Sequence, residues 1–426
     1  MAPEPPAPAP PLLLTNVNVF TGKSLTPEYG MSVLIRDGLI ADLQPGSLAP
    51  AAGTVIVDGG GRTLMPGLID NHTHLFLSAN TQAQIMDETG EPGVLFDRTR
   101  AEATRTLLRG FTSVRDMGGP VFGIKRDIDN GTAIGPRIYP SGAVISQTAG
   151  HGDFRPPGAQ ARRFGGQQSV AERLGATFIV DGRDEILTAV RENLRAGASQ
   201  IKILAGGGVV SAFDPIDVAQ YTLDEMTAAV QATTDWNTYV TVHAYTPKAV
   251  RRAVQAGVAC IEHGQLLDEP TVQLLADNGI WLSLQAFDEE PATASKFSRE
   301  KNHAVVEGQD QVFRWARKHD VKVAYGTDIL FGEPTENQNK RFTYLSRWFS
   351  PAEALRIATY DNAQLLALSG PRNPYPGKLG IIEPGAYADV LLVDGDPTVN
   401  LELIGNPDNF TVIIKDGRIV KNTLDS

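Results

Sequence analysis

Two histidines one residue apart, His72 and His74, end an apolar run that reads LMPGLIDNHTHL. Side chains at positions i and i+2 of a β-strand share one face, so both imidazoles could bind one metal ion. Imidazole nitrogen is a common ligand of zinc and of related divalent metals. A single His-x-His pair also arises by chance, so it indicates a metal site only if other parts of the chain supply further ligands.

Further polar residues with suitable chemistry end four later apolar runs. They are Lys202 in QIKILAGGG, His243 in VTVHAY, His263 in CIEHG and Asp328 in AYGTD. Taken one at a time, such residues are usually core histidines, surface lysines or turn aspartates. Their coincidence at predicted strand ends is what favours a metal site. By contrast, His303 and His319 lie in helical patterns, which predicts that both are surface residues.

The lysine is the unusual member of this set, because an ammonium group should not approach a metal cation. Burial lowers a lysine pKa, and the resulting neutral amine can react with carbon dioxide to form a carbamate, whose two anionic oxygens could bridge two ions. We therefore predict two divalent ions, with zinc as the default and manganese or cobalt as alternatives. The predicted ligands are His72, His74 and Asp328 for one ion, His243 and His263 for the other, and carboxylated Lys202 between them.

A barrel of alternating strands and helices would bring these residues together. Residues 67–368 alternate apolar strand patterns with helical patterns such as DEILTAVRENLRAGA and PKAVRRAVQAG. The predicted strands are LMPGLIDNH, FTSVRDM, RIYPSGAVIS, QIKILA, YVTVHA, VACIEH, IWLSLQA and VKVAYGTD. They predict an α/β fold of the (β/α)8 TIM-like barrel type, in which active sites form at the carboxyl ends of the strands. A doubly wound open sheet is the alternative, but the sequence lacks the glycine fingerprint that this fold predicts after the first strand.

The two ends of the chain carry similar strand patterns. VLIRDGLIADL near the N-terminus is echoed by VIIKDGRIVKN near the C-terminus. We therefore predict that residues 12–66 and 369–426 form one small β-sandwich domain, with the catalytic barrel of residues 67–368 inserted between them. The proline-rich residues 1–11 predict a disordered lead. They contain no apolar signal-peptide core, which predicts a cytoplasmic protein; if the lead is the remnant of a processed signal, the protein would be periplasmic or secreted.

Composition excludes several classes of function. The 426 residues carry a net charge of −11 and contain no basic block, which argues against a nucleic-acid partner. No apolar run reaches the roughly 18 residues that a membrane span needs. The single cysteine, Cys260, excludes internal disulfides and a cysteine-rich zinc site.

The chain resembles the metal-dependent amidohydrolase superfamily in GLIDNHTHL, IKI, TVHAY, IEHG and GTD, and in MPGLID and GIIEPGAYADVLLVDGDP nearer the two ends. The resemblance covers nearly the whole chain and implies a binuclear metal site with a carboxylated Lys202. A narrower resemblance, in SGAVISQTAGHGDFRPP and HAYT, is to the imidazolonepropionase-like or Xaa-Pro dipeptidase-like branch. That branch includes carboxypeptidases, prolidases and hydrolases of the mycotoxin ochratoxin A.

The narrower resemblance implies a small-molecule substrate, either an amide or a dipeptide-like compound with a hydrophobic C-terminal residue. Ochratoxin A, cleaved to ochratoxin alpha and phenylalanine, is the specific expectation. The resemblance also implies a homo-oligomer, with octamers among the relatives.

In such a site we expect Asp328 to accept a proton from water and later to deliver it to the leaving amine. Tyr245 and His151 are expected to assist, by donating to the developing oxyanion or by orienting the substrate. The Gly- and Pro-rich stretch 151–168 predicts a loop over the barrel mouth. Candidate substrate-binding residues are Arg155, Arg162 and Arg163 for a carboxylate, and Phe287 and Phe331 for an apolar group.

Several other functions share parts of this pattern. A deaminase on the same scaffold usually needs a His-x-x-Glu motif, but Thr246 stands three residues after His243. A cyclic-amide hydrolase of the imidazolonepropionase type, a lactonase or a phosphotriesterase would use the same metal chemistry with a different pocket, so these remain alternatives. A metal-free scaffold protein is the non-enzyme alternative, and loss of the metal ligands would mark it.

Overall fold

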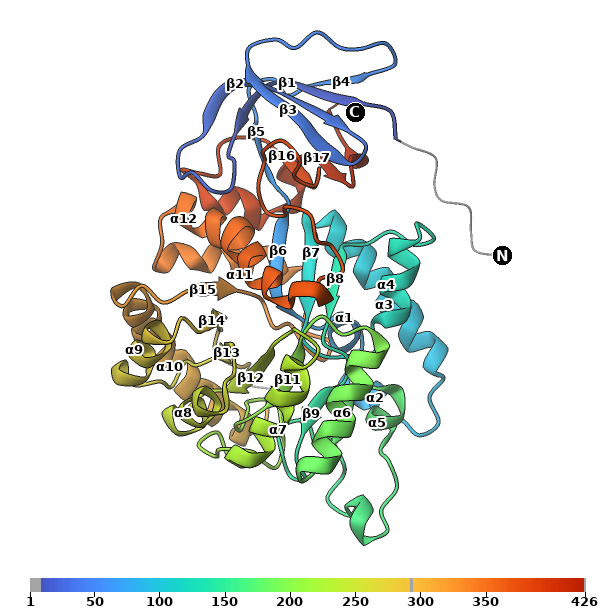
Figure 1. Cartoon of the computed structure of the whole chain (residues 1–426), viewed down its shortest axis with the longest axis vertical. Coiled ribbons are helices and arrows are strands. Elements are labelled where there is room, and N and C mark those ends of the chain that lie inside the picture. The colour runs from blue at the N-terminus through green and yellow to red at the C-terminus, as the bar shows by residue number, and fades with distance from the viewer. Residues whose placement is uncertain (1–8, 292–293, 425–426) are drawn as a thin grey trace.

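The computed structural model describes residues 9–291 and 294–424. A barrel takes up the larger part of the chain, and a separate β-sheet built from both chain ends lies above it in the view of Figure 1. Residues 1–8 of the predicted disordered lead lie outside the described residues. Within the described part, no helix is long and apolar enough to cross a bilayer.

Parallel strands form the barrel in two hydrogen-bonded ladders. The first ladder is β6 (Leu68–Thr73), β7 (Phe111–Asp116) and β8 (Arg137–Pro140). The second is β10 (Thr177–Ile179), β9 (Val144–Ser146), β11 (Ile201–Leu204), β12 (Val240–Ala244), β13 (Cys260–His263), β14 (Trp281–Leu284) and β15 (Val323–Tyr325). The N–H of Asp328, just after β15, donates to the carbonyl of His72 in β6 at 2.8 Å, which joins the last strand to the first. Each strand predicted for the barrel is present, so the TIM-like fold is confirmed.

The third barrel strand differs from the prediction. RIYPSGAVIS divides into β8 and β9 between Ser141 and Ala143. Gly142 has a φ of +77°, and a Cβ there would lie 2.5 Å from Asn193 Oδ1, so this turn requires glycine. β9 then pairs with β10, a short strand that the sequence pattern did not predict.

The barrel strands are buried on both faces, as expected of parallel strands covered by helices. Every residue of β6, β7, β11, β12, β13 and β14 is buried. Among these residues are the charged side chains of Arg115, Lys202 and Glu262. A buried charge is costly unless it is paired or bound to a ligand, so these positions mark the chemistry inside the barrel.

Helices follow most barrel strands and form the outer layer (Figure 1). They are α1 (Leu75–Ala79), α2 (Gln82–Ile85), α3 (Pro92–Leu108), α4 (Phe122–Asp129), α5 (Val170–Leu174), α6 (Arg183–Ala196), α7 (Leu223–Thr234), α8 (Pro247–Ala256), α9 (Glu269–Asp277), α10 (Lys296–Lys318), α11 (Asn337–Thr343), α12 (Pro351–Arg356) and α13 (Asn362–Leu366). Several begin with a capping box, as at Thr222, whose hydroxyl accepts from the Glu225 N–H while the Glu225 carboxylate accepts from the Thr222 N–H. His303 is exposed on α10 and His319 caps its C-terminal end, so neither lies inside the barrel.

The second sheet takes strands from both ends of the chain. It contains β1 (Leu12–Val19), β2 (Glu28–Arg36), β3 (Leu39–Pro45), β4 (Val55–Asp58), β5 (Thr63–Pro66), β16 (Val390–Val393), β17 (Phe410–Lys415) and β18 (Arg418–Asn422). The two echoed motifs are equivalent hairpins: Asp-Gly turns at residues 37–38 and 416–417 join β2 to β3 and β17 to β18, with positive φ at both residues of each turn. The sheet therefore joins the two ends as expected, while the boundaries 12–66, 67–368 and 369–426 remain a prediction.

Candidate metal centre and active-site cavity

The predicted metal ligands gather at the carboxyl ends of the barrel strands. They come from β6, β11, β12 and β13 and from the segment after β15. A small cavity of about 50 Å³ is lined by all of them: His72, His74, Lys202, His243, His263 and Asp328. The barrel thus brings residues from distant parts of the sequence into one cavity.

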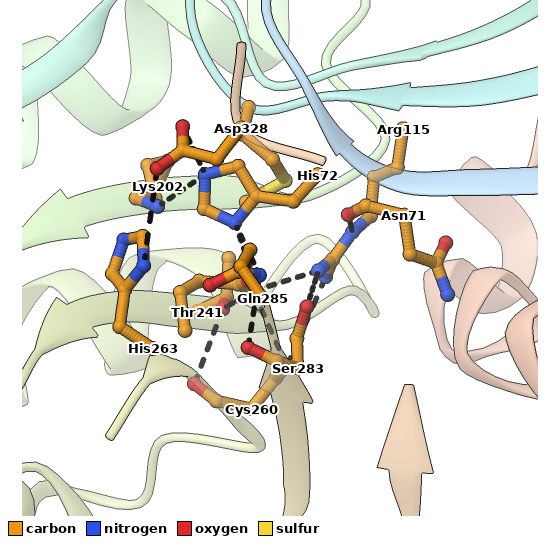
Figure 2. A network of polar contacts seen from close by, with 12 residues as sticks. Asn71, His72, Arg115, Lys202, Thr241, Cys260, His263, Ser283, Gln285 and Asp328 are labelled. Atoms are coloured by element: carbon orange, nitrogen blue, oxygen red, sulfur yellow. Dashed lines mark hydrogen bonds and ion pairs between the residues drawn. The ribbon is translucent and has the colours of Figure 1, made fainter. Parts of the chain in front are cut away.

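The Asp328 carboxylate lies close to three of the histidines, and Figure 2 shows it beside His72 and Lys202. Its Oδ1 is 3.4 Å from His72 Nε2 and 3.4 Å from His74 Nε2, and its Oδ2 is 3.9 Å from His263 Nδ1. One ligand atom from each of His72, His263 and Asp328 lies within 4.8 Å of the other two. Two ligands bound to a tetrahedral zinc ion at about 2.1 Å stand about 3.4 Å apart, so this spacing suits a metal ion.

Three of the histidines use one ring nitrogen for a fixed hydrogen bond, which leaves the other nitrogen free to bind a metal. His72 Nδ1 is 2.9 Å from the Glu262 carboxylate. His74 Nδ1 and His243 Nε2 each donate to a main-chain carbonyl at 3.0 Å. Partners of this kind fix the tautomer and the ring orientation of metal-binding histidines.

The Nδ1 atom of His263 indicates that these side chains fit a metal ion. It is buried and has no hydrogen-bond partner among the described residues, and a buried polar atom without a partner is costly. Burial lowers the pKa of His72 to about 4, and it lowers the pKa values of His243 and His263 well below the usual histidine value. These imidazoles are therefore neutral, which is the form that binds metal ions.

Lys202 is buried among these ligands. Only 2% of the residue is exposed, and its Nζ lies 3.4 Å from His72 Nε2 (Figure 2). Burial lowers the pKa of Lys202 to about 8, although the charges of Glu262 and Asp328 act in the opposite direction. A lysine that loses its proton this readily can react with carbon dioxide, and the resulting carbamate would replace a cation by an anion among the ligands.

Beneath the metal ligands, a buried ion pair crosses the barrel interior. The Arg115 guanidinium donates to the Glu262 carboxylate at 2.7 Å, and both side chains are fully buried. Burial alone would raise the pKa of Glu262, but Arg115 and His72 hold it well below its usual range. This pair was not predicted from the sequence, where its only signal is Arg115 inside the strand pattern FTSVRDM and Glu262 inside VACIEH. The pair fixes the carboxylate that orients His72.

A larger cavity of about 670 Å³ adjoins the metal ligands. Its lining includes several of the predicted catalytic and substrate residues: His151, Tyr245, Phe287, Asp328 and Phe331. Tyr245 is 3% exposed, and its ring stacks on His263 with the centroids 5.0 Å apart. Burial raises the pKa of Tyr245 well above its usual value, so its hydroxyl remains a hydrogen-bond donor at neutral pH.

The three arginines predicted to bind a substrate carboxylate do not line this cavity. Arg155 forms two short contacts with Asp153, at 2.6 and 2.7 Å. Arg162 donates to a main-chain carbonyl at 2.8 Å, and Arg163 lies 3.4 Å from Glu185. All three border a separate pocket of about 330 Å³. Acidic and carbonyl groups near the same loop bind these guanidinium groups. The prediction that these arginines bind a substrate carboxylate was therefore wrong, because the sequence does not show these local partners.

The guanidinium that does line the large cavity belongs to Arg341, in α11. It donates to the Thr327 carbonyl at 2.6 Å and to the Glu333 carboxylate. The remaining charged side chains of the lining beyond the metal ligands are acidic: Asp288, Glu289, Glu290 and Glu333. The sequence analysis missed Arg341 because nothing in its helical pattern separates it from a surface arginine.

The chain is similar in sequence and in fold to known proteins. Residues 63–420 match the model of the Amidohydrolase family. Over 372 residues, which are 84% of this chain and 75% of the relative, the chain is 32% identical to ochratoxinase of Aspergillus niger. The crystal structure of A. niger ochratoxinase superposes with a TM-score of 0.82 at 26% identity, covering 98% of this chain and 97% of that one. A crystal structure of a prolidase complexed with N-methylphosphonate-L-proline gives a TM-score of 0.88 at 31% identity, covering 97% of this chain and 100% of that one.

Proposed function

The chain belongs to the amidohydrolase family, and on this premise we propose that it is a binuclear metal-dependent hydrolase that cleaves an amide or peptide bond to a C-terminal amino acid. The observation that carries this proposal is the single cavity lined by all six predicted metal ligands, which are four of its histidines, Lys202 and Asp328. Zinc suits that donor set, because it binds imidazole and carboxylate ligands at the spacings found here.

The proposed ligand assignment divides the six side chains of this cavity between two ions, with Asp328 close to histidines of both groups. One ion would be held by His72, His74 and Asp328, the other by His243 and His263, with carboxylated Lys202 between them. Divalent ions bound there supply Lewis acidity, which lowers the pKa of water and polarises a carbonyl group. Burial keeps His72, His243 and His263 neutral, and the hydrogen bonds on the outer ring nitrogens of His72, His74 and His243 fix the orientation of those rings.

Asp328 is the proposed proton carrier. Burial alone would raise its pKa, but the surrounding histidines hold the pKa of Asp328 below its usual value, so the side chain is an ionised carboxylate. Its backbone N–H is bonded to the His72 carbonyl, which fixes the residue at the mouth of the small cavity. We propose that the carboxylate accepts a proton from the attacking water and then delivers it to the leaving nitrogen.

Tyr245 and His151 are proposed to contact the reacting amide. The Tyr245 hydroxyl makes no hydrogen bond to the residues that the structure describes, and it stays protonated because burial raises its pKa. It can therefore donate to the carbonyl oxygen as negative charge develops there. His151 lines both cavities and stacks on His243 with the ring centroids 4.3 Å apart, so its free ring nitrogen is also available to the substrate.

The lining of the large cavity supports an apolar substrate group with a carboxylate. Val209, Val210, Phe287, Leu330 and Phe331 supply apolar surface. Arg341 supplies the guanidinium that a free carboxylate would need, and it would bind that carboxylate in addition to Glu333 and the Thr327 carbonyl. Ochratoxin A has these features, because its amide joins a fused aromatic acid to phenylalanine.

A dipeptide, for example of the Xaa-Pro type, is the second candidate, and the acidic part of the lining favours it. Glu290 lines the cavity, and no described residue forms a hydrogen bond or ion pair with its carboxylate. A dipeptide has a free α-ammonium group that could pair with Glu290, whereas ochratoxin A has no cation. The two substrates therefore make different demands on the same cavity.

A hydrolysis panel tests the proposal. Zinc-loaded protein would be incubated with ochratoxin A, N-acyl-phenylalanine, Xaa-Pro and Xaa-Lys dipeptides, a cyclic amide, a lactone and a phosphotriester, and the products identified by mass spectrometry. We expect release of a free amino acid from at least one of the linear amides. Turnover confined to the cyclic amide, the lactone or the phosphotriester would refute the proposed substrate class, and a chain that binds no metal and hydrolyses nothing would favour the scaffold alternative.

We propose that the protein forms a homo-oligomer. Its proposed partner is a small-molecule substrate. Light scattering on the eluate of a sizing column would measure the mass, and a mass of 45.8 kDa, that of one chain, would contradict the oligomer.

A further inference from the structure

The segment that joins β11 to α7 folds over the edge of the metal cavity. Its two ends are held together by a bridge between Gly206 and Ala219 and by the Gln220 N–H, which donates to the Ala205 carbonyl at 2.8 Å. Val209 and Val210, within the segment, line the large cavity. We call residues 205–220 the β11–α7 loop.

This loop holds the imidazole of His151. Ser211 Oγ lies 2.7 Å from His151 Nδ1, and Asp214 Oδ2 lies 3.5 Å from the same nitrogen. The backbone of Gly208 lies against the ring so closely that a Cβ there would be 2.0 Å from it. The Gln220 side-chain oxygen accepts a hydrogen bond from the main-chain N–H of His151 at 3.0 Å. His151 therefore has little freedom to turn.

The hydrogen-bond pattern selects one tautomer of His151. Ser211 Oγ can donate its proton to the Gly208 carbonyl at 3.1 Å, which leaves its oxygen to accept from His151 Nδ1 at 2.7 Å. A hydroxyl has one proton to give. The neighbouring carboxylate of Asp214 favours the same arrangement, because it faces Nδ1 from the loop. With Nδ1 carrying the proton, Nε2 is left with a lone pair on the ring that lines both cavities.

A buried lysine of α10 ties this loop to the barrel's outer layer. Lys301 is 4% exposed, and its Nζ donates to three main-chain carbonyls of the loop, those of Gly208 at 2.5 Å, Ser211 at 2.7 Å and Asp214 at 3.3 Å. Each of these three residues also lies against the His151 ring. The three donors of the ammonium are thus all used on one stretch of backbone.

Asp214 completes the arrangement from inside the loop. It is 2% exposed, and its Oδ2 accepts from the Gly208 N–H at 3.0 Å and from the Gln220 side chain at 3.2 Å. Asp214 therefore connects Gly208, which lies against the His151 ring, with Gln220, which binds the His151 main-chain N–H. Loss of this carboxylate would loosen the loop and His151 together.

We propose that Asp214 and Lys301 are positioning residues for the hydrolysis, which act by keeping His151 in the Nδ1-protonated tautomer with its Nε2 lone pair presented to the substrate cavity. In this orientation His151 accepts a hydrogen bond from the substrate or from water, whereas the other tautomer would offer a donor. The proposal rests on the proposed function, because it is there that His151 contacts the reacting amide.

The first test needs no substrate. The zinc-loaded full chain would be labelled with ¹⁵N-histidine, and the ring nitrogens of His151 assigned by the signals lost in His151→Gln. We expect the wild-type shifts of an Nδ1-protonated ring, and mixed tautomers in Asp214→Asn and Lys301→Met. Lys318→Met, on the exposed part of the same helix, is the matched control and should leave the spectrum unchanged. An Nε2-protonated His151 in the wild type, or an unchanged tautomer in both variants, would overturn the proposal.

The second test is kinetic, on the substrate that the panel identifies. Removal of residues that orient a catalytic group typically costs about 10- to 100-fold. We expect kcat to fall by that factor in Asp214→Asn and Lys301→Met with KM changed by less than about threefold, and Lys301→Arg to recover part of the loss. A kcat within about twofold of wild type in folded Asp214→Asn would contradict the positioning role, and this isosteric variant covers the case in which Lys301→Met fails to fold. If the tautomer is as expected but no amide is hydrolysed, the proposed function fails and the positioning role of the loop stands.

Discussion

Removal of the Arg115 guanidinium should destabilise the barrel far more than loss of a surface arginine. In Arg115→Met, the buried Glu262 carboxylate loses its partner at 2.7 Å. The Asn71 carbonyl loses a donor at 2.7 Å and Ser283 Oγ one at 3.3 Å. Breaking a buried ion pair by removing one partner costs about 3–5 kcal/mol, which raises the equilibrium constant for opening about 10² to 10⁴-fold, since about 1.4 kcal/mol is a factor of ten.

The assay can use the single cysteine, which lies beside this pair. Cys260 is fully buried, and burial raises the pKa of its thiol to about 12, so it should react with a thiol reagent only when the barrel opens. We expect the labelling rate of Cys260 under native conditions to be about 10² to 10⁴-fold higher in Arg115→Met than in the wild type. Arg195→Met is the control, because Arg195 is exposed and, among the described residues, forms an ion pair only with Glu192 on the same helix; the variant should stay within about 0.5 kcal/mol of wild type.

The result that would refute this reasoning is a labelling rate in Arg115→Met within about fivefold of wild type. A double variant adds a second check. Because Glu262→Gln removes the charge left unpaired by Arg115→Met, the two changes together should cost less than the sum of the single changes. An additive double variant would mean that the pair is not coupled.

Three further predictions concern turnover. Asp328→Asn keeps the shape of the side chain but removes the proton acceptor, so kcat should fall by about 10²–10⁴-fold with an unchanged circular dichroism spectrum; near-normal kcat would remove Asp328 as the proton carrier. Tyr245→Phe removes the proposed oxyanion donor, so kcat should fall by about 10²–10³-fold with little change in KM, and an effect on KM alone would assign the hydroxyl to substrate binding instead. Glu290→Gln should raise KM for dipeptides by about two- to fivefold, because one exposed charge pair is worth about 0.5–1 kcal/mol, and it should leave KM for ochratoxin A unchanged; equal effects on both substrates would argue against pairing with the α-ammonium group.

The barrel and its metal ligands could be predicted from the sequence because both depend on local patterns. Each buried parallel strand is a short apolar run, and the histidine ligands and Asp328 stand at or just after the ends of such runs. Lys202 is the exception, because it lies inside β11. The terminal sheet was recognisable from its repeated Asp-Gly hairpins. The break in the third strand was not, because Gly142 makes its turn inside an otherwise apolar run.

The residues around the ligands could not be predicted, because their roles depend on contacts between distant segments. Arg155 looked available in the sequence, but Asp153 satisfies it two residues away. Arg341 and Lys301 looked like ordinary polar residues of helices, and only the packing of those helices turns one toward the cavity and the other toward the β11–α7 loop. Arg115 and Glu262 lie on opposite strands of the barrel, and nothing local links them.

The central claim is that six side chains hold two divalent ions bridged by a carboxylated Lys202, and the metal content of the purified chain tests it most directly. We predict about two ions per chain in the wild type by elemental analysis. Lys202→Ala should lose most of this metal, and a short carboxylic acid such as propionate should restore part of it. A wild-type chain with no metal, or a Lys202→Ala variant with the same metal content as wild type, would contradict the account.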